Sequence, residues 1–188
     1  MPTVISHALV PLIASVTVKR PKFPLRVLAV AMVAAVLPDA DVVHSALGIP
    51  KDHILGHRGI SHSLGFSILV GLMAASIGPV LRVSRWRAFL IVGLASLSHP
   101  LADMLTDGGR GIALFWPVSD MRIFFPFRPI EVSPISVSRF FDRGAWTILG
   151  SEILWLLLPL SFVAISIRLV RHAKCRRPEA IDLPSGRT

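Results

Sequence analysis

The sequence predicts an all-α protein, a multi-pass transmembrane helical bundle with about 4–5 membrane helices. Hydrophobic residues make up 53% of the 188 residues and charged residues only 16%, whereas a soluble domain usually has about 25% charged residues. Five apolar runs divide the chain, and many of its Lys and Arg residues gather beside the ends of these runs. We expect one membrane-embedded domain over residues 1–175 and a disordered basic tail over residues 176–188.

The apolar runs differ in how well they match a bilayer, which takes about 20 helical residues to cross. The runs are Val4–Val18, Val27–Leu37, Leu64–Leu81, Ala88–Ala102 and Trp146–Ile167. The third and fifth are long enough, the first and fourth can be extended at their ends, and the second is marginal and could enter the bilayer at an angle. A soluble bundle of buried helices is the alternative, but the charge-free third run and a mean hydropathy of +0.66 argue against it.

The positions of the basic residues predict an orientation. Lys and Arg cluster between the first two runs, between the third and fourth, and after the fifth. These three zones share one side if every run crosses, and the positive-inside rule makes that side cytoplasmic. The segments Leu37–Ser63 and Asp103–Ala145 would then lie on the extracytoplasmic face of the inner membrane. The net charge of +9 is explained by these flanks. Membrane lipid is therefore an expected partner and nucleic acid is not.

One outer segment, Ile112–Ala145, is unusually aromatic for a loop and carries several Arg residues. Aromatic and basic side chains favour the headgroup level of a bilayer. We expect this segment to lie in the outer interface, partly over the helix ends; ordinary loop packing is the alternative.

Histidine and aspartate residues occur at four predicted helix ends, all on the same side of the membrane. They come from the end of each of the first four runs or the segment beside it. The candidate metal ligands are His7, Asp39, Asp41, His57, His62, His99 and Asp103. Because ionisable groups at membrane depth are costly and usually functional, the sequence predicts that they form one site.

The local spacing of these residues indicates how they could converge. His99 and Asp103 are four residues apart, so a helix would place them on one face. Asp39 and Asp41 follow Pro38, which should end the preceding helix. In an extended segment their side chains would point the same way.

The string His57-Arg58-Gly59-Ile60-Ser61-His62-Ser63 precedes the third run. Gly59 allows a tight turn there, and we expect Ser61 to cap a helix that begins near His62.

Imidazole and carboxylate ligands together suit zinc, manganese or iron. We expect one or two divalent ions, zinc or manganese, which would activate water for hydrolysis. As catalytic residues we expect Asp103, as a base, and Arg58, which could neutralise a phosphate or carboxylate on the substrate.

Other ionisable residues have ordinary interpretations. We expect His44, His53 and His172 to be packed or solvated. Glu152, about two turns into the fifth run, could transfer protons, bind metal or hydrogen-bond to a neighbouring helix. Glu131 lies in the aromatic segment, and nothing in the sequence fixes its direction.

The same motifs carry a family resemblance. They are Met1-Pro2-Thr3 with Ser6-His7, Leu37-Pro38-Asp39-Ala40-Asp41, the His57–Ser63 string, Ser98-His99-Pro100-Leu101-Ala102-Asp103-Met104-Leu105-Thr106, Gly108-Gly109 and Leu114-Phe115-Trp116-Pro117. In this order they resemble the YdjM-like family of inner-membrane proteins, described as LexA-binding and as membrane-bound metal-dependent hydrolases. The resemblance covers roughly residues 1–170. Ser61 departs from it, because the family commonly has Thr there.

The resemblance implies a multi-pass helical protein with a metal site at the candidate ligands and Arg58. Combined with the residue chemistry, it favours a metal-dependent hydrolase that cleaves an ester or phosphoester in a lipid or amphiphilic substrate. A non-enzymatic metal-binding scaffold or regulatory protein is the alternative. A LexA-type regulator as partner is implied by the resemblance alone.

Overall fold

The computed structural model describes residues 1–18, 24–50, 53–134, 137–142 and 144–175. Its helices are α1 (Val4–Ser15), α2 (Leu25–Val36), η1 (Leu37–Ser45), η2 (Ile60–His62), α3 (Leu64–Ser76), α4 (Arg85–Asp103), α5 (Val137–Asp142), α6 (Ala145–Glu152), η3 (Ile153–Leu157) and α7 (Leu158–Cys175). Within these residues, β structure is limited to two isolated bridges. The all-α class is therefore confirmed, while the predicted tail, residues 176–188, lies outside the described part.

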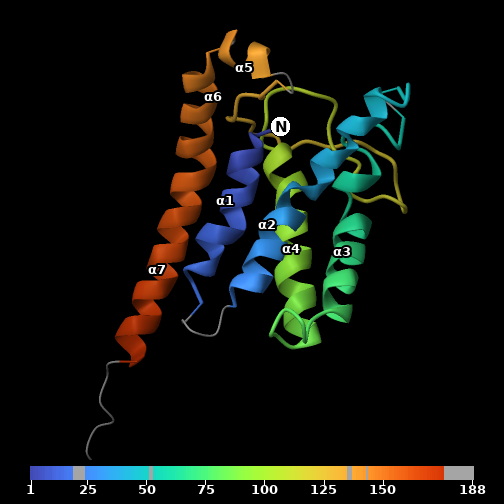
Figure 1. The fold of residues 1–188 in the computed structure, drawn as a ribbon. Coiled ribbons are helices and arrows are strands. Elements are labelled where there is room, and N and C mark those ends of the chain that lie inside the picture. The colour runs from blue at the N-terminus through green and yellow to red at the C-terminus, as the bar shows by residue number, and fades with distance from the viewer. Residues whose placement is uncertain (19–23, 51–52, 135–136, 143, 176–188) are drawn as a thin grey trace, which may run out of the picture.

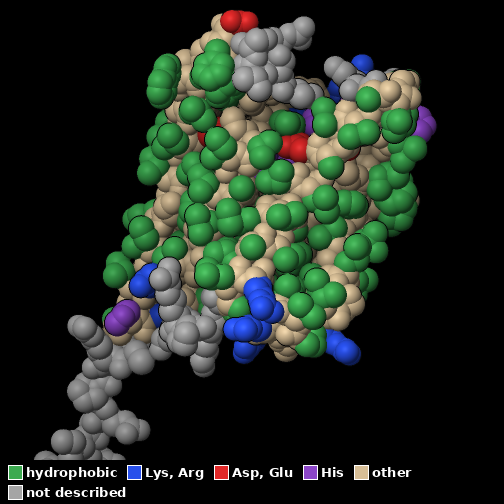
Figure 2. Space-filling model, viewed as in Figure 1, with side chains coloured by type: hydrophobic (Ala, Val, Ile, Leu, Met, Phe, Trp, Pro, Cys, Tyr) green, Lys and Arg blue, Asp and Glu red, His purple; other side chains and the backbone are tan. Residues whose placement is uncertain are grey.

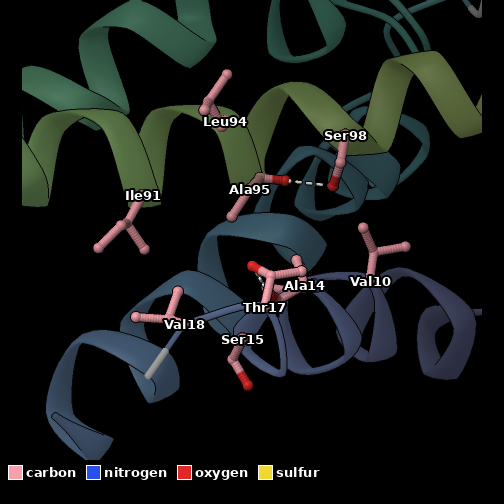
Figure 3. A pocket seen from close by; sticks show the side chains of 10 residues that line it. Val10, Ala14, Ser15, Thr17, Val18, Ile91, Leu94, Ala95 and Ser98 are labelled. Carbon is pink, nitrogen blue, oxygen red and sulfur yellow. Dashed lines mark hydrogen bonds between the residues drawn. The ribbon is translucent and has the colours of Figure 1, made fainter. Parts of the chain in front are cut away.

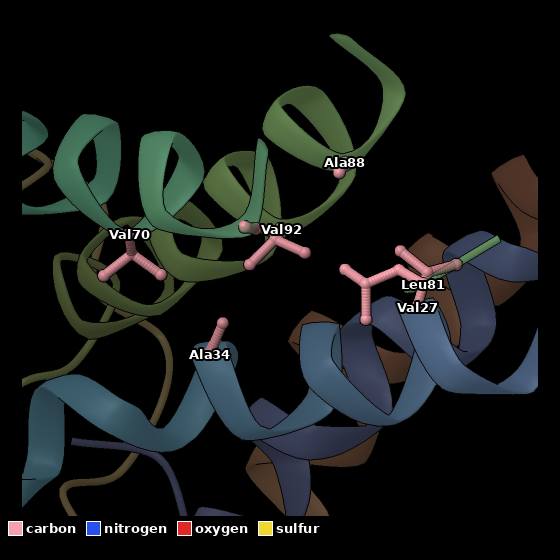
Figure 4. Close-up of a cluster of buried hydrophobic side chains, with 7 residues drawn as sticks. Val27, Ala34, Val70, Leu81, Ala88 and Val92 are labelled. Carbon is pink, nitrogen blue, oxygen red and sulfur yellow. The ribbon is translucent and has the colours of Figure 1, made fainter. Parts of the chain in front are cut away.

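The bundle is built around α4, which packs against both α2 and α3. Figure 1 shows α1 to α4 running side by side, with α6, η3 and α7 continuing as one long helix beside α1. Small and β-branched side chains fill the centre, among them Val27, Ala34 and Val92 (Figure 4). Such side chains let helix backbones approach closely, as in membrane bundles.

The outside of the bundle is largely apolar. Figure 2 shows hydrophobic side chains over most of the visible face, and residues such as Met73, Leu94 and Phe162 are each at least 60% exposed. A soluble monomer rarely exposes so large a continuous apolar surface. The surface therefore matches a protein surrounded by lipid.

Within the described residues, two helical stretches are long and apolar enough to cross a bilayer, Leu25–His44 and Ala145–Ala173. The second of these confirms the expectation for the fifth run. The first contains the run expected to be marginal, which gains length because η1 continues α2 directly.

The prediction that Leu64–Leu81 forms one spanning helix is wrong. Helix α3 ends at Ser76 after 13 residues, which corresponds to about 20 Å. Gly78 and Pro79 follow in a turn, and proline disfavours helical backbone at the residue before it. The expected 4–5 membrane helices are therefore not confirmed: in the described part of the chain two helices are long and apolar enough to span, and α1 and α3 are shorter apolar helices.

The described basic residues of the three zones lie at one end of the bundle. The guanidinium of Arg26 donates to the carbonyl of Val80 in the α3–α4 turn, and Arg171 donates to the carbonyl of Thr17 after α1. Figure 2 shows Lys and Arg side chains gathered at this lower end. The opposite end carries η1, η2 and the first turn of α1.

Candidate metal centre

Helices α1 and α4 bring three fully buried candidate ligands together at the upper end of the bundle. His7 lies in the first turns of α1, and His99 and Asp103 lie on one face of α4, as their spacing predicts. His7 Nε2 is 3.4 Å from Asp103 Oδ1, and the rings of His7 and His99 stack with centroids 3.7 Å apart. One ligand atom from each of these three residues lies within 4.8 Å of the others. We call His7, His99 and Asp103 the helix set.

A second group, Asp39, His57 and His62, satisfies the same distance criterion. We call it the turn set, because its members lie in η1, η2 and the turn between them. Asp39 Oδ1 is 3.3 Å from His99 Nε2 and 3.9 Å from His62 Nε2. His62 Nε2 is also 3.7 Å from Asp103 Oδ2. The two sets are therefore contiguous and form one cluster.

The extended conformation considered for the segment with Asp39 and Asp41 is wrong. The segment is a 3-10 helix over Leu37–Ser45, with Pro38 in its first turn. Helix α2 does end before Pro38, at Val36. The two carboxylates consequently have different neighbours: Asp39 approaches His99, whereas Asp41 approaches His57 and His62.

Asp41 organises the loop rather than joining either set of ligand atoms. Its Oδ1 is 2.7 Å from His57 Nδ1, and its Oδ2 is 3.1 Å from His62 Nδ1. Oδ2 also accepts from the backbone N–H of Arg58 (3.1 Å) and from the hydroxyl of Ser61 (2.7 Å). A carboxylate on Nδ1 fixes the imidazole orientation and leaves Nε2 free to bind, an arrangement typical of metal-ligating histidines.

The predicted role of Ser61 as a helix cap is wrong, because its hydroxyl binds Asp41. Ser63 caps α3 instead, accepting from the backbone N–H of Phe66. The expectation for Gly59 is confirmed: a Cβ there would lie 1.9 Å from the carbonyl oxygen of Ile54. Arg58 itself has a positive φ of 65°, a backbone conformation uncommon for residues other than glycine.

The cluster contains buried polar atoms without hydrogen-bond partners. They are both ring nitrogens of His7, Nε2 of His62 and of His99, and both carboxylate oxygens of Asp39 and of Asp103. Buried polar groups are normally paired, and leaving one unpaired costs about 1–3 kcal/mol. Burial lowers the pKa of His62, which keeps its ring neutral and Nε2 available as an electron-pair donor. A divalent cation could bind one nitrogen of each imidazole together with carboxylate oxygens of Asp39 and Asp103, so the residues present fit a metal ion.

Arg58 is 2% exposed, and its guanidinium contacts internal acceptors. Its Nε is 3.1 Å from Asp103 Oδ2, Nη1 donates to the carbonyl of Gly108 (2.8 Å), and Nη2 donates to the hydroxyl of Thr106 (3.0 Å). From the sequence, this side chain was predicted to face a substrate. The contacts place it against Asp103, so its positive charge pairs with that buried carboxylate.

Glu152 forms the helix contact that was one of its three predicted alternatives. It is fully buried and accepts from the backbone N–H (2.6 Å) and hydroxyl (2.7 Å) of Thr3 and from the hydroxyl of Ser6. Thr3 caps α1, so Glu152 anchors this helix one residue before His7. The roles of Thr3 and Ser6 were not predicted. The one sequence signal for them was Glu152, a carboxylate within an apolar run that needs polar partners.

The remaining predicted residues lie away from the cluster or at its edge. His44 is buried with Nδ1 2.8 Å from the backbone carbonyl of Asp41, whereas His53 and His172 are exposed. Glu131 is exposed as well. The aromatic segment crosses the helix ends as expected: the carbonyl of Leu114 accepts from the backbone N–H of Leu64.

The fold and the cluster together define a class: a helical protein with a lipid-exposed surface and a buried His and Asp centre at one end. A profile for the YdjM inner membrane proteins matches residues 1–175. The chain is also 39% identical over 160 residues to the inner membrane protein YbcI of Escherichia coli strain K12, covering 85% of this chain and 92% of that protein. No solved structure matches the chain. The chain belongs to the YdjM family of inner membrane proteins.

Proposed function

We propose that this protein is a metal-dependent hydrolase of the inner membrane that cleaves an ester or phosphoester in a lipid or amphiphilic substrate. The observation that carries the proposal is the convergence of unpaired nitrogen and oxygen atoms from five buried residues, His7, Asp39, His62, His99 and Asp103. Imidazole and carboxylate are the ligands of hydrolytic zinc and manganese sites.

In this proposal the helix set and the turn set hold one or two divalent ions, zinc or manganese. Asp39 would connect the sets, because its Oδ1 lies near both His99 Nε2 and His62 Nε2. A bound ion would polarise the bond under attack and supply a water that ionises near neutral pH. His57 is 17% exposed, more than any other member of the two sets.

The chain's own residues then have separate tasks. Asp103 would bind a metal ion or deprotonate the attacking water. Arg58 holds the Asp103 carboxylate in place and offsets its negative charge. Asp41 orients His57 and His62 through their Nδ1 atoms. With Nδ1 directed at Asp41, His57 Nε2 is available to hold a metal ion. The packed side chains around the helix set exclude bulk water.

We further propose a multi-pass topology in which the cluster faces the extracytoplasmic side. The basic residues at the opposite end of the bundle would then be cytoplasmic under the positive-inside rule. Cysteine-accessibility labelling from the periplasmic side, in a Cys175→Ser background, tests this: Ser119→Cys in the aromatic segment should react in intact cells, and Ser84→Cys at the opposite end should not. The reverse pattern would place the site in the cytoplasm.

Hydrolysis can be tested on the purified protein in detergent, with p-nitrophenyl butyrate and bis-p-nitrophenyl phosphate as probes. We expect turnover of one probe that is lost with a chelator, restored by zinc or manganese, and absent in the Asp103→Asn variant. No metal-dependent turnover of either probe by metal-loaded protein would contradict the hydrolase proposal.

A non-enzymatic metal-binding scaffold or regulator is the second candidate. It is favoured by the complete burial of His7, His99 and Asp103, since closed sites are typical of structural metals and catalytic sites keep an open position. A regulator of the LexA type as partner rests on the family resemblance alone. Metal that is bound tightly without turnover of the two probes would favour it.

A further inference from the structure

An apolar groove of about 300 Å³ runs between α1 and α4, below the His and Asp cluster. Figure 3 shows its two walls: Val10 faces Ser98 at one end, and Val18 faces Ile91 at the other. Leu94 on its rim is 60% exposed and Ala14 is also exposed, so the groove opens on the outer surface of the bundle.

Each hydroxyl group in the groove already donates to the backbone carbonyl three residues before it. Ser98 donates to the carbonyl of Ala95, Ser15 to that of Leu12, and Thr17 to that of Ala14. A Ser or Thr hydroxyl that bonds back to the helix has no donor left for a polar ligand. The groove is therefore suited to a hydrocarbon occupant.

The groove begins at the level of the cluster, and its length along α4 approaches the thickness of one leaflet. Ser98 directly precedes His99, and Val10 lies one turn after His7. From Ser98 to Ile91, the wall on α4 is about 10 Å long, compared with about 15 Å for half of the hydrocarbon core. An acyl chain placed there would bring its head group to the upper end of the bundle.

We propose that this groove binds one acyl chain of a lipid whose head group reaches the His and Asp cluster, an inference that rests on the proposed function. The substrate class is then a membrane lipid with an ester or phosphoester near its head group. The α1–α4 groove selects for the chain, and the cluster acts on the bond at its upper end.

The test uses the full-length protein in vesicles of phosphatidylethanolamine and phosphatidylglycerol. The probe is phosphatidylglycerol with a photoactivatable diazirine in one acyl chain, and labelled peptides are identified by mass spectrometry. We expect saturable labelling of the groove residues Val10 and Leu94, which unlabelled phosphatidylglycerol competes away. Labelling around Met73, an exposed apolar residue on α3, should rise linearly with the probe.

Filling the groove should remove the saturable signal. Ala14→Phe is expected to lower it about tenfold, because overfilling a fitted apolar site weakens binding by an amount of this order. Val10→Phe narrows the upper end and serves as a second variant if Ala14→Phe does not fold. Met73→Phe, on α3, is the matched control and should leave groove labelling unchanged.

The outcomes separate this inference from the proposed hydrolysis. Saturable labelling that is lost in Ala14→Phe supports an acyl-chain site whether or not p-nitrophenyl probes are hydrolysed. Groove labelling that rises linearly, as at Met73, would show bulk lipid only and overturn the inference. A disulfide-linked dimer of the Leu94→Cys variant in a Cys175→Ser background would place a second copy at the groove and would also overturn it.

Discussion

The helix set and the turn set use similar side chains but are held in place in different ways. His7, His99 and Asp103 lie on long helices and are fully buried, so the packing of α1 against α4 determines their positions. The turn set lies in 3-10 and irregular backbone and depends on hydrogen bonds to one carboxylate, Asp41. Helix packing therefore positions the helix set, whereas a network of hydrogen bonds positions the turn set.

The largest effect is expected from Asp103→Asn in the helix set. The amide keeps the shape of the side chain but removes its charge, and it pairs poorly with Arg58 and His7. We expect the affinity for zinc or manganese to fall by more than about 100-fold, more than the 10–100-fold typical of residues behind the ligands. Competition titration with a chelator measures it. Asp107→Asn, outside the cluster, is the control, and equal affinities would remove Asp103 from the site.

A smaller loss is expected from Asp41→Asn, which tests whether one residue holds the turn set. The amide can accept through one oxygen only, so it cannot serve His57 and His62 together with the N–H of Arg58. Metal affinity should fall about 10–100-fold without loss of the fold. Asp120→Asn, at an exposed position, should change nothing. A loss as large as for Asp103→Asn would indicate that Asp41 is itself a ligand.

Glu152→Gln tests the anchoring of the helix set. Its amide group would face the donors of Thr3 and Ser6, leaving at least one of them unpaired. We expect a loss of about 1–3 kcal/mol in stability, measured by thermal unfolding in detergent, together with weaker metal binding because α1 carries His7. Glu131→Gln is the matched control at an exposed position. Unchanged stability would mean that the Glu152 contacts contribute little.

The smallest effect compares two helix caps at opposite ends of the bundle. Ser63 caps α3 beside the turn set, and Ser84 caps α4 at the basic end. Either Ser→Ala change should cost about 1 kcal/mol in stability. Only Ser63→Ala should also weaken metal binding, because it lies next to His62. Equal metal affinities in the two variants would show that the turn set tolerates a loosened α3.

The helix set was largely predictable from the sequence, because α-helical periodicity alone puts His99 and Asp103 on one face. The basic residues further predicted which helix ends share a level, and this brought His7 into the same group. The apolar runs that form the lipid-exposed helices could also be predicted from the sequence. The third run is the exception in length, because Gly78 and Pro79 end its helix after 13 residues.

The members of the turn set could be predicted from the sequence, but their positions relative to one another could not. A period-two spacing does not distinguish an extended segment from a 3-10 helix, and only the latter separates the directions of Asp39 and Asp41. The inward guanidinium of Arg58 depends on contacts with residues more than 40 positions away, Thr106 and Gly108. The partners of Glu152 are almost 150 residues away. Sequence-local rules do not reach such distances.

The most direct test of the central claim is X-ray absorption spectroscopy of the purified, metal-loaded protein. We expect one or two equivalents of zinc or manganese with a first shell of nitrogen and oxygen only, including the signature of several imidazoles. This prediction follows from the unpaired atoms of His7, His62, His99, Asp39 and Asp103. A first shell that contains sulfur, or a protein that binds no metal at all, would contradict the account.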